Sequence, residues 1–155
     1  SKEDYFHLLL QYAKSHSIKD EKGENQKWID ENLNPFTGDW ISRTRLKSWD
    51  NGTWSHEKGG VERGKDYNHS GFCDLIISDL LGLKPRVDNI VEINPLIPNK
   101  WDWFCLENVR YHNRELTFVW DRTGKKYNKG KGLLIFVDGV LKAKTNQIER
   151  LTYKL

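Results

Sequence analysis

The chain has 155 residues, 37% of them hydrophobic, which is enough for one ordinary domain or a pair of small packed ones. Its 25 basic and 22 acidic side chains are interspersed and leave a formal charge of +3, too weak a bias to predict nucleic-acid binding. No run approaches the roughly 20 apolar residues of a membrane helix, so we expect no membrane span. The two cysteines lack metal-ligand spacing, and we expect buried free thiols, no metal and no cofactor.

The chain starts with Ser1 and contains no methionine. We therefore expect further sequence upstream of Ser1. The first residues lack the apolar segment of a signal peptide. If such a peptide has been removed, a periplasmic or extracellular location is favoured.

The first half of the chain predicts two helices separated by a long irregular stretch. Apolar residues recur every three or four positions over residues 4–15, which predicts an amphipathic helix with a wide buried face. Residues 17–27 are polar and predict an exposed connection. Residues 70–81 predict a second helix, with Ser70 as N-cap and Gly82 just past its end.

Residues 28–69 lie between these helices, hold four of the seven tryptophans and lack periodicity. Irregular segments of this length inside compact domains are usually functional. We therefore expect loops that form a site.

Beyond Pro85 the pattern changes to short β-rich runs. The expected strands are 90–94, 104–111, 115–121, 132–137, 140–143 and 148–153. Residues 112–114 form a candidate hairpin turn, and Asp138-Gly139 suits a type I′ turn. Alternation along 116–121 predicts a strand with one buried face. The fold class is therefore α+β, with a helical part over residues 1–85 and an antiparallel, sandwich-like β domain over 86–155.

The segment from Trp28 to Trp40 places two adjacent carboxylates, Asp30 and Glu31, between tryptophans and beside a Pro/Gly turn. Glycosidic-bond hydrolysis needs one carboxylic acid and one carboxylate, and sugar rings stack on Trp and Tyr. The same pattern also fits solvated loop acids beside core tryptophans, so the residues alone leave both readings open.

A second polar cluster precedes the helix at 70–81. Its residues 62–69, Glu-Arg-Gly-Lys-Asp-Tyr-Asn-His, are dense in groups that can grip sugar hydroxyls. These residues also fit a salt-bridged surface loop. Taken by itself, His69 is more typical of a hydrogen-bonded structural histidine than of a proton shuttle.

Residues 31–38, Glu-Asn-Leu-Asn-Pro-Phe-Thr-Gly, resemble a loop of glycoside hydrolase family 63 and its (α/α)6 six-hairpin relatives. Residues 62–70 and the helix after them resemble the last barrel segment of bacterial proteins with a domain like that of mannosylglycerate hydrolase. Residues 94–98, 101–104, 109–112 and 116–120 resemble the β domain that follows this barrel.

The resemblance implies an inverting glycoside hydrolase that cleaves an α-linked O-glycosidic bond, with an oligosaccharide or glycoside as substrate. Glu31 would be its general base, and the general acid would lie upstream of Ser1 on the remainder of the barrel. The implied substrate-binding residues are Trp40, Arg43, Lys65, Asp66, Tyr67 and His69. Because two carboxyl groups must face each other across a water, we expect the chain by itself to be inactive.

A carbohydrate-binding or interaction module is the alternative. In that case Trp101, Trp103 and Trp120 would form an open, coplanar row on a β-sandwich. Burial of these three tryptophans against the helices would instead indicate a structural cap.

Overall fold

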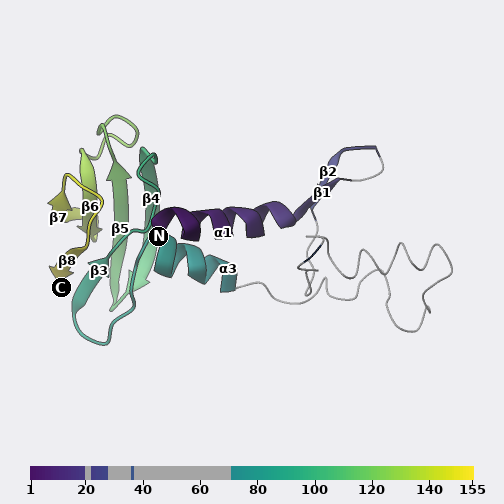
Figure 1. Ribbon diagram of the computed structural model, residues 1–155. Helices are drawn as coiled ribbons and strands as arrows, with labels where there is room; N and C mark the ends of the chain where they lie inside the picture. Colours follow the sequence, from purple (N-terminus) through teal and green to yellow (C-terminus); the bar gives the residue numbers. More distant parts are fainter. Residues whose placement is uncertain (20–21, 28–35, 37–70) are drawn as a thin grey trace. The chain divides into compact units, whose positions relative to one another are not determined.

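The computed structural model describes residues 1–19, 22–27, 36 and 71–155. By its contacts the chain divides into two units, Ser1–Phe6 with Gly71–Leu155, and His7–Ser70. The first unit contains the β-rich part and the second helix, and all of its residues are described (Figure 1).

Helix α1 spans Lys2–Ser15, close to the predicted bounds. Its N-terminus is capped by Ser1, whose Oγ accepts a hydrogen bond from the Asp4 backbone N–H at 3.2 Å. The helix is confirmed, but the wide buried face is wrong for this chain. Leu9 is buried, whereas Leu8 is 64% exposed and Leu10 is 36% exposed.

A short hairpin follows α1. Strands β1 (Ser17–Lys19) and β2 (Asn25–Lys27) pair antiparallel, with Ile18 opposite Gln26. Gly23, in the turn, has a φ of 79°, which glycine adopts without strain. The sequence predicted only an exposed connection here, because a pair this short shows no apolar alternation.

The second predicted helix is confirmed in place but differs in type. An α-helical turn, α3 (Gly71–Asp74), continues as a π-helix, η2 (Leu75–Leu80). The Leu81 N–H reaches back to the Ile76 carbonyl at 2.8 Å, a five-residue step that apolar periodicity does not reveal. The predicted N-cap, Ser70, lies outside the described residues.

Gly82 ends this helix with a φ of 77°, as its predicted position past the helix requires. Its backbone lies directly against the segment after β3, because the Asn94 N–H donates to the Gly82 carbonyl at 2.9 Å. A Cβ at position 82 would overlap the Asn94 carbonyl. The close approach of two backbones therefore joins the helix to the β-rich part.

Two antiparallel sheets make up the β-rich part (Figure 1). One sheet has the order β4-β5-β6-β7, and the other pairs β3 with β8. The strand bounds are β3 Ile90–Ile93, β4 Trp103–Tyr111, β5 Arg114–Asp121, β6 Gly132–Val137, β7 Val140–Thr145 and β8 Leu151–Lys154. This sandwich-like antiparallel architecture agrees with the prediction.

Both predicted hairpins are confirmed, although the first turn has two residues, 112 and 113, rather than the predicted three. His112 and Asn113 have φ values of 46° and 62°, and Asp138 and Gly139 have 50° and 78°. Two consecutive positive φ values characterise the type I′ turn, which matches the twist of the strands it joins. The pairs Tyr111↔Arg114 and Val137↔Val140 close the two turns.

The core lies around β5 and β6. Phe118, Val119 and Ile135 are fully buried, and Asp121 is 1% exposed. The prediction of one buried face on residues 116–121 is wrong, because β5 is a central strand covered on both faces from Phe118 onward.

The cysteines differ from the expected buried thiols. Cys73 is exposed, and Cys105 is partly buried. Burial raises the pKa of the Cys105 thiol, and the nearby Glu107 carboxylate adds to this effect. Across the described residues, no helix is both long and apolar enough to cross a membrane.

We predict that Gly82→Ala lowers the free energy of unfolding by clearly more than Gly139→Ala. Both residues have a left-handed φ, which costs a non-glycine residue about 1–2 kcal/mol, but only the new methyl at position 82 meets backbone. Urea denaturation of the two variants measures the difference. Equal losses would show that the contact between residues 82 and 94 contributes nothing.

Candidate functional site

The residues that the sequence assigns to catalysis and substrate binding lie outside the described residues. Their predicted roles therefore stay predictions. They are Glu31, Trp40, Arg43, Lys65, Asp66, Tyr67 and His69. The described candidate site lies instead on the β-rich part, around the three tryptophans that follow residue 100.

These tryptophans do not form an open row. Trp120 is 4% exposed, whereas Trp103 is 50% exposed and Trp101 is partly buried. Trp120 sits near the end of β5, where the strand is covered on both faces, and its Nε1 donates to the Trp101 carbonyl at 3.0 Å. The predicted coplanar platform is therefore wrong, and so is uniform burial of all three.

Residues 99–103, here called the tryptophan loop, are fastened to the end of β5 by backbone groups. The Trp101 N–H closes a turn onto the Pro98 carbonyl at 3.0 Å. The Trp101 carbonyl accepts from Trp120 and also from Arg122 Nη2 at 3.2 Å. The Arg122 N–H donates to the Asp102 carbonyl at 2.9 Å, so the loop is held at several points.

The Arg122 side chain completes this anchor. Its Nε forms an ion pair with Asp102 Oδ1 at 2.8 Å, and its Nη2 also donates to the Asn99 carbonyl. The guanidinium carbon lies 6.0 Å from the centre of the Trp120 ring, within reach of a cation–π contact. The charge of Arg122 is thus balanced within the site.

Trp103, the last residue of the tryptophan loop, has a second cation beside it. Lys126 Nζ lies 4.2 Å from the centre of the Trp103 ring, and the Tyr127 ring meets it edge to face with centroids 6.3 Å apart. Such contacts hold an exposed indole in place by the attraction of its π face and edge. Trp103 is therefore ordered by neighbours from the loop after β5.

The buried carboxylate of Asp121 holds the loop after β5 in place. Its carboxylate accepts hydrogen bonds from the backbone N–H groups of four residues at 2.7–3.2 Å: Thr123, Gly124, Lys126 and Tyr127. Burial raises the pKa of the carboxyl, but these four N–H donors outweigh burial and hold the pKa below its usual range. The charge is buried yet fully hydrogen-bonded, as buried carboxylates must be.

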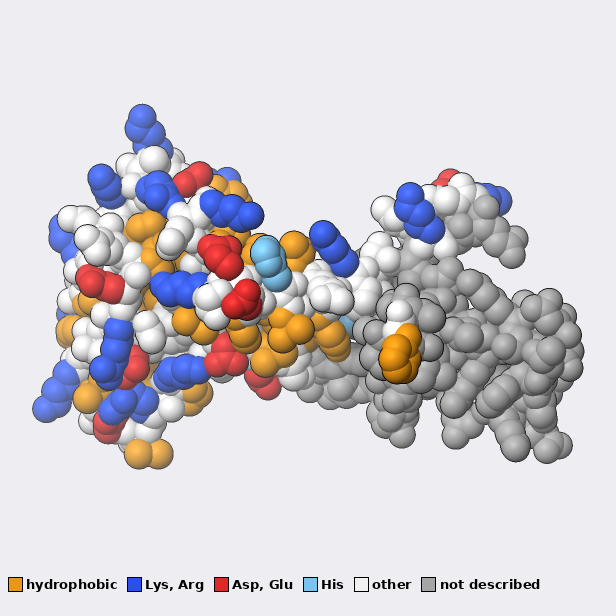
Figure 2. Space-filling view, in the orientation of Figure 1, with side chains coloured by type: hydrophobic (Ala, Val, Ile, Leu, Met, Phe, Trp, Pro, Cys, Tyr) orange, Lys and Arg blue, Asp and Glu red, His pale blue; other side chains and the backbone are white. Residues whose placement is uncertain are grey.

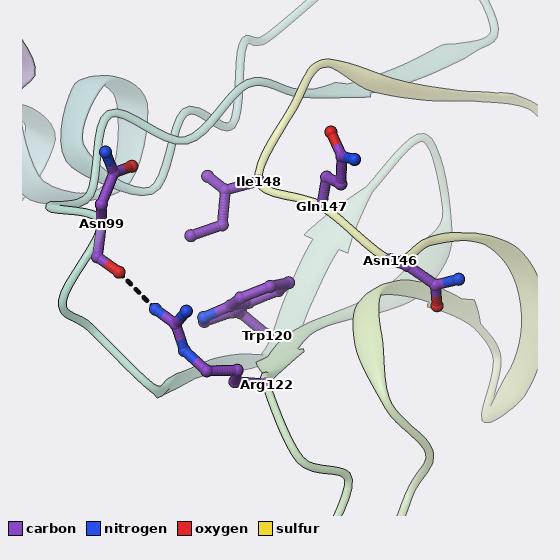
Figure 3. A pocket seen from close by; sticks show the side chains of 6 residues that line it. All are labelled: Asn99, Trp120, Arg122, Asn146, Gln147 and Ile148. Atoms are coloured by element: carbon purple, nitrogen blue, oxygen red, sulfur yellow. Dashed lines mark hydrogen bonds between the residues drawn. The ribbon is translucent and has the colours of Figure 1, made fainter.

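Within residues 71–155, two hollows flank the tryptophan loop. One has a volume of about 370 Å³ and is lined by loop residues 100–103. The other has a volume of about 330 Å³, and Figure 3 shows the Trp120 indole at its centre with polar side chains around it. Its lining residues are Asn99, Trp120, Arg122, Asn146, Gln147 and Ile148.

The surface charge on this part is mixed. Figure 2 shows lysine and arginine side chains spread over the β-rich part, with acidic side chains between them. Among the described residues, no group of three or more His, Cys, Asp or Glu side chains is placed to hold a metal ion. The two hollows are lined by polar and aromatic residues.

Sequence reasoning missed the second hollow. It draws on three separate segments, at residue 99, at 120–122 and at 146–148, which only the fold brings together. The tryptophans were the visible signal, and they indicated an open aromatic surface rather than a hollow lined by residues from three segments.

The β-rich part matches a known domain. Residues 83–141 match the family model described as glycosyl hydrolase family 65, C-terminal domain. A solved structure described as a sialidase is similar over 98% of this chain, with 42% sequence identity and a TM-score of 0.77. The chain carries a glycoside hydrolase-associated C-terminal domain.

The segment matched to this glycoside hydrolase-associated domain begins one residue after Gly82 and reaches into β7. It therefore includes the tryptophan loop, Asp121 and both confirmed hairpins. The chain spans 12% of the length of the sialidase structure. The domain features described above thus correspond to a small portion of that larger protein.

We predict that Asp121→Asn lowers the free energy of unfolding by about 1–3 kcal/mol, because an amide oxygen cannot satisfy four buried N–H donors as a carboxylate does. Urea denaturation at neutral pH measures the loss. Asp138→Asn is the matched control, since the Asp138 side chain is 44% exposed and its ion pair with Arg114 contributes little. Equal losses in both variants would contradict the role of Asp121.

The same variant gives a pH test. Because the folded pKa of Asp121 is depressed, its contribution is fully present above the usual pKa of about 3.9 and is lost as pH falls through the lower folded value. The stability difference between wild type and Asp121→Asn should therefore shrink on acidification. A difference that stays constant down to acid unfolding would contradict the assignment.

Proposed function

We propose that the chain is the C-terminal part of a longer glycoside hydrolase. In this proposal the β domain caps the end of a six-hairpin (α/α)6 barrel, and residues 1–85 contribute the barrel's last helices and active-site loops. The reaction is inverting hydrolysis of an α-linked O-glycosidic bond. Glu31 is the general base, and the general acid lies on the part of the barrel upstream of Ser1.

The single observation that carries the proposal is the pair of comparisons taken together. The β part matches a domain described as C-terminal in a glycoside hydrolase family, and 98% of the chain is similar to a protein about eight times longer, of which it spans 12%. A domain of this kind functions beside a catalytic domain rather than alone. Membership of family 63, as the loop at residues 31–38 suggests, stays a prediction.

The exposure of apolar side chains on the helical elements supports the proposal. Leu8 is 64% exposed and Leu10 is 36% exposed on α1, and Leu75 is 41% exposed at the start of η2. An amphipathic helix is stable when its apolar stripe is covered, and further barrel helices would provide that cover. In this proposal, α1 lacks the buried face that its sequence predicts because the barrel helices that would cover Leu8 and Leu10 belong to the longer protein.

The proposed mechanism assigns one step to Glu31. In an inverting hydrolase the base removes a proton from water as the water attacks the anomeric carbon, while the acid protonates the departing oxygen. The two carboxyl groups must stand roughly 6.5–9.5 Å apart to leave room for that water. Trp40 would stack on the sugar, and Arg43 with the residues between 65 and 69 would bind its hydroxyls.

We predict that Glu31→Gln in the longer protein lowers kcat by about 10²–10⁴ while changing KM little, because an amide cannot accept the proton of water. The measurement is steady-state kinetics on α-linked glucosides and mannosides, with a sialoside included because the similar structure is described as a sialidase. Asp30→Asn is the matched control, since it removes the neighbouring carboxylate and should leave kcat nearly unchanged.

The chain by itself is the negative control for this experiment. The 155-residue chain, assayed on the same substrates, should show no turnover, because it lacks the proposed acid. An unchanged kcat in Glu31→Gln would remove Glu31 from the role of base. Turnover by the short chain would contradict the proposed division of the two carboxyl groups.

A further inference from the structure

The connection between β5 and β6 concentrates positive charge that the rest of the chain spreads out. Residues 124–131, here called the lysine loop, read Gly-Lys-Lys-Tyr-Asn-Lys-Gly-Lys and contain no acidic residue. The whole chain has a formal charge of only +3, so these lysines are a local excess. Figure 2 shows basic side chains at the end of the β-rich part where Figure 1 draws the loop after β5. The lysines of the loop are Lys125, Lys126, Lys129 and Lys131.

The charges of these four lysines are not compensated by ion pairs. All four side chains are exposed, and within residues 71–155 no carboxylate forms an ion pair with any of them. Two of them lie over aromatic rings instead. Lys126 Nζ is 4.2 Å from the centre of the Trp103 ring, and Lys129 Nζ is 5.5 Å from the centre of the Phe136 ring. An aromatic ring attracts a cation but carries no net charge, so the ammonium groups can still pair with an anion.

The acidic groups beside the lysine loop do not cancel this charge. Asp121 is buried, and its carboxylate already accepts four backbone N–H groups. Asp102 is paired with Arg122 at 2.8 Å. Glu107, on β4, is exposed, which leaves one carboxylate against four lysines. The surface around the loop is therefore positive.

Strand β7 adds a further lysine to this surface. The lysine loop passes over Leu134 of β6, because a Cβ on Gly130 would lie 3.6 Å from Leu134 Cδ1. Lys144 is directly opposite Leu134 in the register of β6 and β7. Directly opposite residues of an antiparallel pair project from the same face of a sheet. Lys144 is exposed, so it extends the positive surface along the sheet.

The lysine loop is held in shape before any ligand binds. Asp121 fastens its first half through backbone hydrogen bonds. The two ends of the loop meet, because a Cβ on Gly124 would lie 3.1 Å from the Lys131 backbone nitrogen. A loop with closed ends gathers its side chains on one small surface, where neighbouring charges act together. Binding groups on an anchored backbone also lose less entropy when a ligand is bound.

An exposed indole adjoins the lysines. Trp103 is 50% exposed, and it lines the hollow of about 370 Å³ together with Lys100. Lys100 is exposed as well, so cations from the tryptophan loop and from the lysine loop lie on either side of this residue in the chain. Trp side chains contact the carbon face of sugar rings, and ammonium groups form charge-assisted hydrogen bonds to carboxylates and sulfates. Aromatic and cationic groups side by side suit a sugar that carries negative charge.

The composition of the surface selects among anionic partners. Proteins that bind a membrane surface combine basic residues with apolar side chains that enter the lipid. The one apolar side chain of the lysine loop, Tyr127, is partly buried and meets the Trp103 ring edge to face. Single-stranded nucleic acid is bound by several exposed aromatic rings in succession. Of the tryptophans that follow residue 100, Trp101 is partly buried and Trp120 is buried, so Trp103 offers no such row.

We propose that the lysine loop and Trp103 bind an anionic polysaccharide, whose carboxylate, sulfate or phosphate groups pair with the lysine side chains. This surface would keep the enzyme on a charged polymer. The negative charge of the ligand follows from the lysine loop itself, whereas its being a glycan rests on the proposed function. All the residues involved belong to the β domain, so the proposal can be tested without catalysis.

The test is a ¹H–¹⁵N NMR titration of the full chain with oligogalacturonate and, separately, with a dextran sulfate oligosaccharide. At least one of them should shift the backbone signals of residues 124–131 and the indole signal of Trp103 in a saturable way. Methyl-esterified oligogalacturonate and unsulfated dextran keep the sugars but lack the charge, and they should bind far more weakly. Added salt should weaken the binding, because exposed charges are screened.

The double variant Lys125→Gln/Lys131→Gln should weaken this binding about tenfold, because it removes two of the paired charges. Within residues 71–155, neither lysine contacts a carboxylate or an aromatic ring, so the fold should be unaffected, as an unchanged backbone spectrum verifies. Lys142→Gln/Lys154→Gln is the matched control. It removes the same charge from the hollow beside Asp138 and from β8, and it should leave the affinity nearly unchanged.

Absence of saturable shifts with both anionic glycans would overturn the proposal. Equal binding of the uncharged counterparts, or equal losses in the two double variants, would overturn it as well. Phosphatidylglycerol vesicles and a single-stranded oligonucleotide test the class of partner. Either one binding the lysine loop more tightly than the anionic glycans would overturn the assignment to a polysaccharide.

This proposal and the proposed function fail separately. Loss of glycan binding at the lysine loop leaves the kinetic effect of Glu31→Gln untouched. An active Glu31→Gln enzyme leaves the titration of the β domain untouched.

Discussion

The end of strand β5 is the point on which the described structure depends. β5 is hydrogen-bonded to β4 along one edge and to β6 along the other, and its last four residues are buried. In a strand paired along both edges, a shift by one residue would move every side chain to the opposite face and would displace both Trp120 and Asp121. Trp120 and Asp121 therefore project from a rigid position.

Those two residues then order the loops on either side. Trp120 and its neighbour Arg122 hold the tryptophan loop through the Trp101 carbonyl, and Asp121 gathers four backbone N–H groups of the following loop. Both flanking loops contribute to the surroundings of Trp103. The conformation of both surface loops thus depends on buried residues at the end of β5.

Turn chemistry and strand periodicity could be predicted because they are local. Asp138-Gly139 specifies its turn whatever surrounds it, and the β strands were predicted to within a few residues. The burial of β5 on both faces could not be predicted, since it depends on what packs over the strand. The π-helical step after Asp74 likewise leaves no trace in apolar spacing.

The two candidate sites differ in the same way, because one is local in the sequence and the other depends on the fold. Glu31 was predicted from a motif that is contiguous in the chain, and it lies outside the described residues. The hollow beside Trp120 draws on Asn99, Trp120 and Gln147, which meet only after folding. A set of residues this far apart in the chain carries no sequence signal of its own, so a hollow of this kind becomes visible only in three dimensions.

The proposed glycosidase is tested most directly by the anomeric form of its first product. NMR of the longer protein acting on an α-linked substrate would follow the released sugar before it equilibrates in water. Inversion, which requires a carboxylate such as Glu31 to activate water, predicts that the β anomer appears first. Initial release of the α anomer would indicate a covalent, retaining pathway and would contradict the role proposed for Glu31.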